Sequence, residues 1–374
     1  MSTILREVCL KLAVAVEISA AKWVVASCCG GGKKIRRKVL SQESPSGRFA
    51  ALVEELIAAR RHFGLPEDAR TVVAYEAGQE GFWLVRALLA QRIEAQVINP
   101  ASLQVDRRAR RAKTDRLDSQ ALVSSLWRYL EGEEQALRMV RIPSELAEDE
   151  REWQRERDRL QGERRGCADR IRKKLRTHGL WKLPGDWRKR LREGRLHGYH
   201  GPLGPTLQAM LRVELERLEA ADAKLKELLE RCAELTPVAT QRIQALARLR
   251  GIGPVSARGL ALLLYWRKFN NRRQVGACVG LVSAPYDSGL MRQDQGITKE
   301  GDPRLRAGLI ELAWLWLRHQ PDSAITRWFA RRTQGQGARG KRVMIVGVAR
   351  RLAIALWRYL QDGLIPEGAQ LKTL

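Results

Sequence analysis

The chain has 374 residues, of which 68 are Lys or Arg and 42 are Asp or Glu, so its formal net charge is +26. A hydrophobic fraction of 44% excludes a disordered chain, and the length allows two or three domains, each with a core of its own. The charge favours a polyanionic partner, nucleic acid first, because each neutralised phosphate releases counterions; a basic protein that merely stays soluble is the plain alternative.

The first residues lack the pattern of a signal peptide, because Lys11 and Glu17 interrupt their apolar run and no small-residue cleavage pattern follows. No apolar run approaches the roughly 18 residues that a membrane helix needs, and no isolated basic amphipathic tail indicates a membrane surface. The six cysteines form no CxxC and no zinc spacing (Cys9, Cys28, Cys29, Cys167, Cys232 and Cys278). We therefore expect a cytoplasmic protein with reduced cysteines and no membrane partner.

Residues 11–130 alternate strand and helix patterns. The runs "KLAVAVEIS", "RTVVAYEAG" and "EAQVINP" are typical of buried strands, and "KWVVAS" and "KIRRKVL" follow the first run at hairpin distance. Helical periodicity marks "SGRFAALVEELIAARRHF", "EGFWLVRALLAQR" and "DRLDSQALVSSLWRYL". This order predicts a mixed α/β domain whose sheet has a largely parallel centre.

Residues 145–236 carry a heptad pattern in a highly charged segment. Apolar residues recur every seven positions in the first half, at Leu146, Trp153, Leu160 and Cys167. In the second half they step by four and three, with one polar break at Asp222 (Leu211, Leu215, Leu218, Leu225, Leu229 and Cys232). We predict an antiparallel coiled-coil arm with an irregular basic tip rich in Gly and Pro. Two solvated helices packed on a domain core are the alternative.

Residues 241–374 are predicted to form a third, mostly helical domain. Its start, "LRGIGPVSARGLALL", has the form of a helix-hairpin-helix. Gly251 and Gly253 allow a tight turn whose backbone amides can meet a phosphate where the next helix begins. A glycine turn between two packed helices has the same pattern, so both interpretations stay open.

Four carboxylates stand at the ends of the predicted elements of the first domain. Glu17 and Glu76 end two buried strands, and Asp115 and Asp118 begin a helix on one face of it. Oxygen ligands of this kind suit Mg²⁺, which shares its coordination shell with substrate phosphates and can flank a phosphodiester. Helix-start acids are also favoured by the macrodipole alone, whereas a Glu at the end of a buried strand needs a partner.

Cations flank these acids and a turn in the third domain. The run before Asp115 would hold a phosphate backbone, or would be a solvated charge run (Arg107, Arg108, Arg110, Arg111 and Lys113). The turn Asp287-Ser288-Gly289 lies among further cations spaced to surround an anion (Arg292, Lys299, Arg304 and Arg306). A serine there can attack phosphorus and form a covalent ester. Tyr286 is a rival nucleophile, and an ordinary turn fits the spacing as well.

Three motifs resemble those of the insertion-sequence "one-ten" family of transposases, which are bridge-RNA-guided serine recombinases. "VINPASLQVDRRARRAKTDRLDSQAL" is similar to the family's V-x-N-P followed by K-T-D-x-x-D, and "VVAYEAG" to the strand with the second acid. "GLVSAPYDSG…GITKEGDPRLR" resembles G-L-x-P…S-G…G-I-T-K-x-G-N-x-x-L-R. The resemblance covers nearly the whole chain.

The resemblance implies a RuvC-like (RNase H-like) domain with four acids, a coiled coil, and a transposase domain whose catalytic serine is Ser288. It also implies a guide RNA that pairs with donor and target DNA. Two positions depart from the family pattern. The first acid is usually aspartate in G-I-D-x-S, whereas "AVEIS" supplies Glu17, and the asparagine of G-N is Asp302. Glutamate has a longer side chain than aspartate, which can still reach a metal if the coordination shell is shifted.

We therefore expect three domains: a four-acid domain at 1–140, an arm at 141–240 and a transposase domain at 241–374. The expected activity is RNA-guided DNA cleavage and exchange through a phosphoserine, with Mg²⁺ on the four acids and the protein on the bacterial nucleoid when bound. The serine and the acids lie in different expected domains, so a composite site in a dimer or tetramer is expected. A metal-dependent resolvase or nuclease with water as nucleophile, and an inactive nucleic-acid-binding remnant, are the alternatives.

Overall fold

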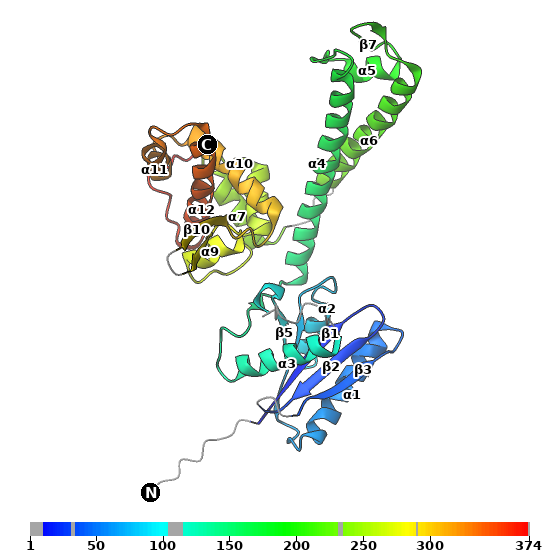
Figure 1. Cartoon of the computed structure of the whole chain (residues 1–374), viewed down its shortest axis with the longest axis vertical. Helices are drawn as coiled ribbons and strands as arrows, with labels where there is room; N and C mark the ends of the chain where they lie inside the picture. The colour runs from blue at the N-terminus through cyan, green and yellow to red at the C-terminus, as the bar shows by residue number, and fades with distance from the viewer. Residues whose placement is uncertain (1–9, 31–33, 104–114, 231–234, 289–290, 373–374) are drawn as a thin grey trace. The chain divides into compact units, whose positions relative to one another are not determined.

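The computed structural model describes residues 10–30, 34–103, 115–230, 235–288 and 291–372, except for the side chains of 115–117, 286–288 and 291–294. The chain forms two compact units, residues 1–143 and 144–374. Figure 1 shows the helices and strands of both units. In the described residues no helix is both long enough and apolar enough to span a bilayer, and Cys28, Cys29, Cys167 and Cys278 carry free thiols.

The first unit is built on one mixed sheet of six strands in the order β3-β2-β1-β4-β5-β6. The central strands β1, β4 and β5 are parallel, and the outer ones are antiparallel to their neighbours. Their bounds are Lys11–Ile18 (β1), Trp23–Cys28 (β2), Arg36–Leu40 (β3), Arg70–Glu76 (β4), Glu94–Ile98 (β5) and Met139–Val140 (β6). The predicted mixed α/β architecture is therefore confirmed for this unit.

Helices cover both faces of this sheet. α1 (Pro45–His62) and α2 (Trp83–Ala90) pack on one face, and α3 (Asp115–Leu130) lies across the other, as Figure 1 shows. A short 3₁₀ turn, η1 (Pro100–Ser102), follows β5. The two faces are filled differently: branched and aromatic side chains meet α1 and α2, whereas alanines of the central strands let α3 approach closely.

The second unit begins with a helical hairpin, called here the arm. α4 (Glu145–Arg176) and α6 (Pro205–Glu230) run antiparallel, and the tip between them holds α5 (Trp187–Arg192), β7 (His197–Gly198) and β8 (Gly201–Pro202). Ser144 caps α4 by accepting a hydrogen bond from Ala147 N, acids occupy its first turn and cations its last.

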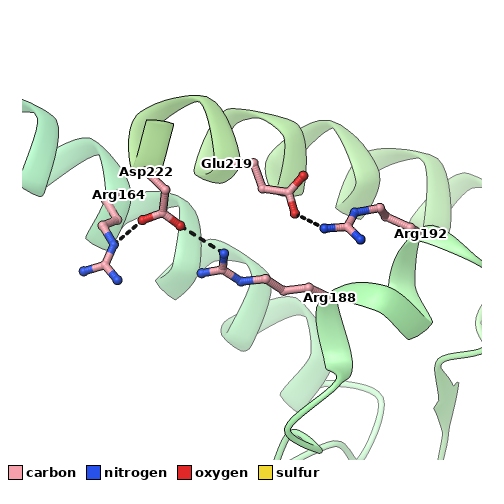
Figure 2. Close-up of polar contacts among 5 residues, drawn as sticks. All are labelled: Arg164, Arg188, Arg192, Glu219 and Asp222. Atoms are coloured by element: carbon pink, nitrogen blue, oxygen red, sulfur yellow. Dashed lines mark hydrogen bonds and ion pairs between the residues drawn. The ribbon is translucent and has the colours of Figure 1, made fainter. Parts of the chain in front are cut away.

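The predicted heptad seam packs within the chain over the outer half of the arm. Leu160, Leu211 and Leu218 are each at most 2% exposed. The polar break is explained by two arginines: Arg164 Nε donates to one oxygen of Asp222 at 2.5 Å, and Arg188 Nη1 donates to the other at 3.0 Å (Figure 2).

Two heptad positions are wrong as packing predictions. Leu146 is 63% exposed, and on α6 Leu229 is 49% exposed. The seam therefore does not extend to the base of the arm, where polar and aromatic contacts replace it.

The rest of the second unit is a helical bundle with one hairpin, β9–β10. Its core is formed mainly by α8, α10 and α12, with Trp316 fully buried at the centre. The bounds are Pro237–Ala247 (α7), Pro254–Leu263 (α8), Arg272–Cys278 (α9), Ser283–Ser288 (β9), Met291–Ile297 (β10), Pro303–His319 (α10), Ala324–Thr333 (α11) and Ala338–Asp362 (α12).

Stacked arginines and tryptophans join the base of the arm to this bundle. The Arg151 guanidinium lies 4.1 Å from the ring centroid of Trp266, and that of Arg258 lies 4.6 Å from the ring centroid of Trp153. Burial lowers the pKa of Arg151 to about 10. Glu150 adds a hydrogen bond, because its Oε1 accepts from Thr236 N at 2.5 Å. Arm and bundle therefore belong to one compact unit.

Candidate functional site

Two of the four predicted acids stand at the ends of neighbouring strands. β1 and β4 pair in parallel, and their register joins Val16 to Tyr75. Glu17 and Glu76 each follow that pair by one residue, near the carboxyl ends of the two strands. Because neighbouring strands lie about 4.8 Å apart, the backbone brings both acids to the same place on the sheet.

Both acids belong to the face of the sheet that α3 covers. Side chains alternate between the two faces along a strand. Ala15 and Ala74, two residues before Glu17 and Glu76, lie in the core cluster beneath α3, whereas the residues between lie in the cluster on the opposite face. The alternation therefore directs Glu17 and Glu76 towards the α3 side.

The direction of α3 brings its first turn to the same end of the sheet. Lys11, at the start of β1, donates through Nζ to the carbonyl of Leu130, at the end of α3, at 2.7 Å. Hence α3 runs antiparallel to β1. From Lys11 to Glu17 the strand rises about 20 Å, and from Leu130 back to Asp118 the helix rises about 18 Å, so α3 is long enough to bring Asp118 towards the end of the sheet where Glu17 stands.

Solvent exposure differs among these acids. Glu17 is partly buried with its Oε2 buried, Asp118 is partly buried, and Glu76 is exposed. Asp115 begins α3, but its side chain lies outside the described residues. Among the side chains that are described, no group of three Asp, Glu, His or Cys residues is close enough to hold a metal ion.

The chemistry of these residues fits a hard divalent cation. Glu17, Glu76 and Asp118 offer only carboxylate oxygens, which Mg²⁺ and Ca²⁺ prefer, from three different elements at one end of one sheet face. The predicted four-acid metal site therefore stays a prediction. The five cations predicted to adjoin these acids lie outside the described residues (Arg107, Arg108, Arg110, Arg111 and Lys113).

The predicted nucleophile belongs to a β-hairpin of the second unit. Ser288 is the last residue of β9 and pairs with Met291, and Asp287 pairs with Arg292. This corrects the prediction that Asp287 and Ser288 form the turn, because backbone pairing continues through both. Residues 289–290 lie outside the described part of the chain, as do the side chains of Tyr286, Ser288 and Arg292.

Two loops fasten the base of this hairpin, and each needs a glycine. Gly280 and Gly301 have φ of +64° and +78°, and a Cβ on either would collide with a backbone carbonyl, that of Glu300 and that of Cys278 respectively. Backbone hydrogen bonds join the same loops, with Lys299 N donating to Gly280 O at 3.2 Å. These two glycines, which belong to the motif that resembles the family pattern, thus allow the backbones of the two loops to approach closely.

The cations near the hairpin differ in how they are used. Arg306 donates through Nη1 to the carbonyls of Glu300, at 3.1 Å, and Val279, at 3.4 Å, so its guanidinium holds the loops. Lys299 and Arg304 are exposed. Lys299 has φ of +58°, a conformation that is uncommon for a residue with a side chain.

Asp302 caps α10, which accounts for one departure from the family pattern. Its Oδ1 accepts from Arg304 N at 2.8 Å and from Leu305 N at 3.4 Å. Asn and Asp are about equally good at this position. An aspartate in place of asparagine therefore preserves the start of the helix.

The glycine turn between α7 and α8 is shaped by packing. Gly251 has φ of +83°, and a Cβ there would lie 3.1 Å from His319 Cβ and 3.4 Å from Leu315 O. The C-terminal segment closes the turn from another side: Lys372 Nζ donates to Ala247 O at 2.6 Å and to Ile252 O at 2.8 Å. Phosphate binding by Gly251 and Gly253 stays a prediction, since the packed-turn interpretation accounts for Gly251, whereas Gly253 has open space around its Cα and a φ of -82°.

Sequence reasoning missed the aromatic residues of the arm tip. Trp181 is 74% exposed and Tyr199 is 83% exposed, within the segment predicted only to be basic and irregular. A signal was present, because "GLWKLPGDWRKR" interleaves tryptophan with Lys and Arg.

Comparison with known proteins points to one family. A family model described as "Transposase IS116/IS110/IS902 family" matches residues 243–328, and a second model, the DEDD transposase domain of IS110, matches residues 14–179. The chain is 40% identical to "Putative transposase y4rJ" of Sinorhizobium fredii, over 96% of this chain and 94% of that protein. It is 34% identical to "Probable family 20 transposase" of Pseudomonas aeruginosa, over 42% of this chain and 46% of that protein.

Proposed function

The chain belongs to the IS116/IS110/IS902 family of insertion-sequence transposases, and we propose that it cleaves and rejoins DNA through a covalent bond to Ser288. In this proposal the acids of the first unit would hold Mg²⁺, which would supply charge neutralisation for the cleavage. The observation that supports the proposal is that Glu17 and Glu76 stand near the carboxyl ends of two neighbouring parallel strands, on the sheet face that α3 covers.

The acids would act by binding and orientation. Glu17, Glu76, Asp115 and Asp118 would hold the cation, and Mg²⁺ bound there would neutralise charge that builds on the phosphate oxygens. The backbone of the two strands that carry Glu17 and Glu76 is held by pairing, whereas the helix that carries Asp118 is held by the packing of α3 on β1. Such preorganisation is needed because Mg²⁺ tolerates little deviation from octahedral geometry.

Ser288 would supply the nucleophile. Its hydroxyl oxygen forms a bond to phosphorus while the bond from phosphorus to one deoxyribose oxygen breaks. The serine proton passes to a base, and the leaving deoxyribose oxygen takes up a proton and becomes a free hydroxyl. A hydroxyl released in the same way on another strand can then attack the phosphoserine. The serine oxygen leaves and takes up a proton, so the serine is restored and the two strands are exchanged. Lys299 and Arg304, which are both exposed, would stabilise the charge on the phosphate.

The nucleic-acid partners would be donor DNA, target DNA and a bridge RNA that pairs with both. The formal charge of +26 supports a large polyanionic partner. Exchange between two DNA ends requires several active sites, so we propose a homodimer that assembles into a tetramer, with the acids of one subunit and the serine of another acting on the same phosphate.

A denaturing gel after incubation with labelled DNA, Mg²⁺ and the RNA transcribed beside the gene tests this function. Ser288→Ala should bind nucleic acid yet form no protein–DNA adduct and no recombinant, whereas Tyr286→Phe should retain both. Cut DNA without an adduct would instead support a metal-dependent nuclease that uses water, and binding without cutting would support an inactive remnant. A dead Tyr286→Phe beside an adduct-forming Ser288→Ala would show that the nucleophile is misassigned.

A further inference from the structure

We propose that the tip of the arm, residues 172–200, binds unpaired nucleotides of a nucleic-acid strand, with Trp181 as the stacking surface. This inference rests on the proposed function, because the strand would belong to the DNA or RNA that the transposase handles. Its evidence is separate, since it uses neither the acids nor Ser288.

Two aromatic rings project from the tip into solvent. Trp181 is 74% exposed and Tyr199 is 83% exposed, although large rings are usually buried to a great extent in folded proteins. Tyr199 is held beside the turn that precedes Trp181: Tyr199 N donates to His178 O at 2.8 Å, and Gly179, with φ of +82°, lies against Tyr199 Cβ. Both rings therefore belong to the tip.

A hollow lies beside Trp181. It has a volume of about 410 Å³ and is lined by Arg172, Arg176, Trp181 and Trp187 among others. The Arg176 guanidinium lies 5.7 Å from the ring centroid of Trp181, and the Arg188 guanidinium lies 5.6 Å from that of Trp187. An indole beside a guanidinium suits a nucleotide, because the base can stack on the ring while the phosphate pairs with the cation.

The helix α5, whose Trp187 lines the hollow, is held against the rest of the arm. Trp187 is partly buried against the core of the hairpin. Figure 2 shows that Arg188 pairs with Asp222 at 3.0 Å and Arg192 with Glu219 at 2.6 Å, which joins α5 to α6. A wall that is already ordered lowers the entropy cost of binding a ligand.

Charge favours a nucleic acid over a second copy of the chain. Residues 172–200, all of which are described, contain ten Lys and Arg and two acids. Half of these cations form no ion pair within the described residues (Lys173, Lys174, Arg176, Lys182 and Lys189). Two such tips would repel each other, whereas phosphates would be attracted.

The exposed rings favour unpaired nucleotides over a duplex. In a duplex the faces of the bases are covered by their neighbours in the stack, so a flat ring finds no partner. In a single strand or a loop the faces are free, and stacking on an aromatic side chain needs no particular base. We therefore assign the tip to single-stranded segments, whether of RNA or of DNA.

The test uses the full chain in EDTA, so that no strand is cut. Oligo(U) and oligo(dT) of about 20 nucleotides, each with one 2-aminopurine, and a duplex of equal length are titrated; one stacked base contributes about tenfold in affinity. Trp181→Ala should weaken binding of the single strands about tenfold and abolish the change in 2-aminopurine fluorescence, and binding of the duplex should change little. Trp181→Phe should retain most of both signals.

The control is Trp314→Ala, which removes another exposed indole, 42% exposed, from α10. It should behave like the wild type. Wild-type affinity and fluorescence in Trp181→Ala would overturn the inference, and so would a loss of self-association by light scattering without any loss of strand binding. Whichever of oligo(U) and oligo(dT) binds with the higher affinity shows whether the tip prefers RNA or DNA. A chain that stacks bases on Trp181 but forms no adduct keeps this inference and rejects the proposed function.

Discussion

Leu218→Ala tests whether the arm is held together within one chain. Leu218 is 1% exposed and packs with Leu211, Leu215 and Cys167 in the seam between α4 and α6. Removing a buried leucine side chain costs about 2–5 kcal/mol, because the transfer free energy is lost and a cavity remains. Leu229→Ala, on the same helix, is the matched control, since that leucine is 49% exposed and should cost no more than about 0.5 kcal/mol.

The assay is hydrogen exchange of the arm amides by mass spectrometry, because it reports the opening of the arm separately from the rest of the chain. A loss of 2–5 kcal/mol corresponds to exchange that is faster by roughly 30-fold to several thousand-fold in α4 and α6. Leu229→Ala should change the same rates by no more than about threefold.

One result would refute this reasoning. If Leu218→Ala left the exchange of α4 and α6 unchanged and lowered the mass measured by light scattering, the seam would pack against a second copy. The predicted coiled-coil dimer would then be formed by the residues that the structure pairs within one chain.

Asp118→Ala should abolish strand cleavage while retaining nucleic-acid affinity, because it removes a carboxylate but no cation; full cleavage would reject the metal site. Gly301→Ala should lower the free energy of unfolding by at least about 1–2 kcal/mol in thermal unfolding, since φ is +78° and the Cys278 carbonyl blocks a Cβ. The control Gly308→Ala, on an open helix surface, should raise the same free energy by up to about 1 kcal/mol. Burial raises the pKa of Cys28 from 9.0 to about 11, so iodoacetamide at neutral pH should leave Cys28 unlabelled until the chain unfolds. Its contribution to stability is full below pH 9 and is lost as the pH rises through about 11.

The first unit was predictable because β1 and β4 contain continuous apolar runs and β5 ends in one, before Asn99 and Pro100. β1, β4 and β5 are buried on both faces, and α3 begins at Asp115 as its periodicity indicates. β6 escaped prediction, since a strand of two residues, Met139–Val140, carries no period and depends entirely on pairing with β5.

The candidate site was predictable only in part. That acids end two strands is readable from the sequence, but that Glu17 and Glu76 share a face depends on which strands are neighbours. Only the turn Asp287-Ser288-Gly289 was predicted, and the strands β9 and β10 were not, because "SAPYDSGLMRQDQGI" has few apolar residues and no clear alternation. The contacts of Lys372 with the α7–α8 turn join residues more than 100 positions apart and leave no local signal.

Some residues of the motif "GLVSAPYDSG…GITKEGDPRLR" hold the base of the hairpin together, and others are candidates for function. A two-stranded hairpin alone is marginally stable in water, so Ser288 can be held in place only if the loops at its base are fixed. Gly280 and Gly301 allow those loops to touch, and Arg306 bonds to their carbonyls.

Lys299 is the member that packing does not explain. It is exposed, yet it holds φ of +58°, a conformation that costs a residue with a side chain about 1 kcal/mol or more. Its amide is bonded to Gly280 O, so the loop imposes this conformation on it. Nothing in the core requires a lysine at this position. Its positive charge beside the hairpin that carries Ser288 agrees with the proposed role of stabilising the phosphate.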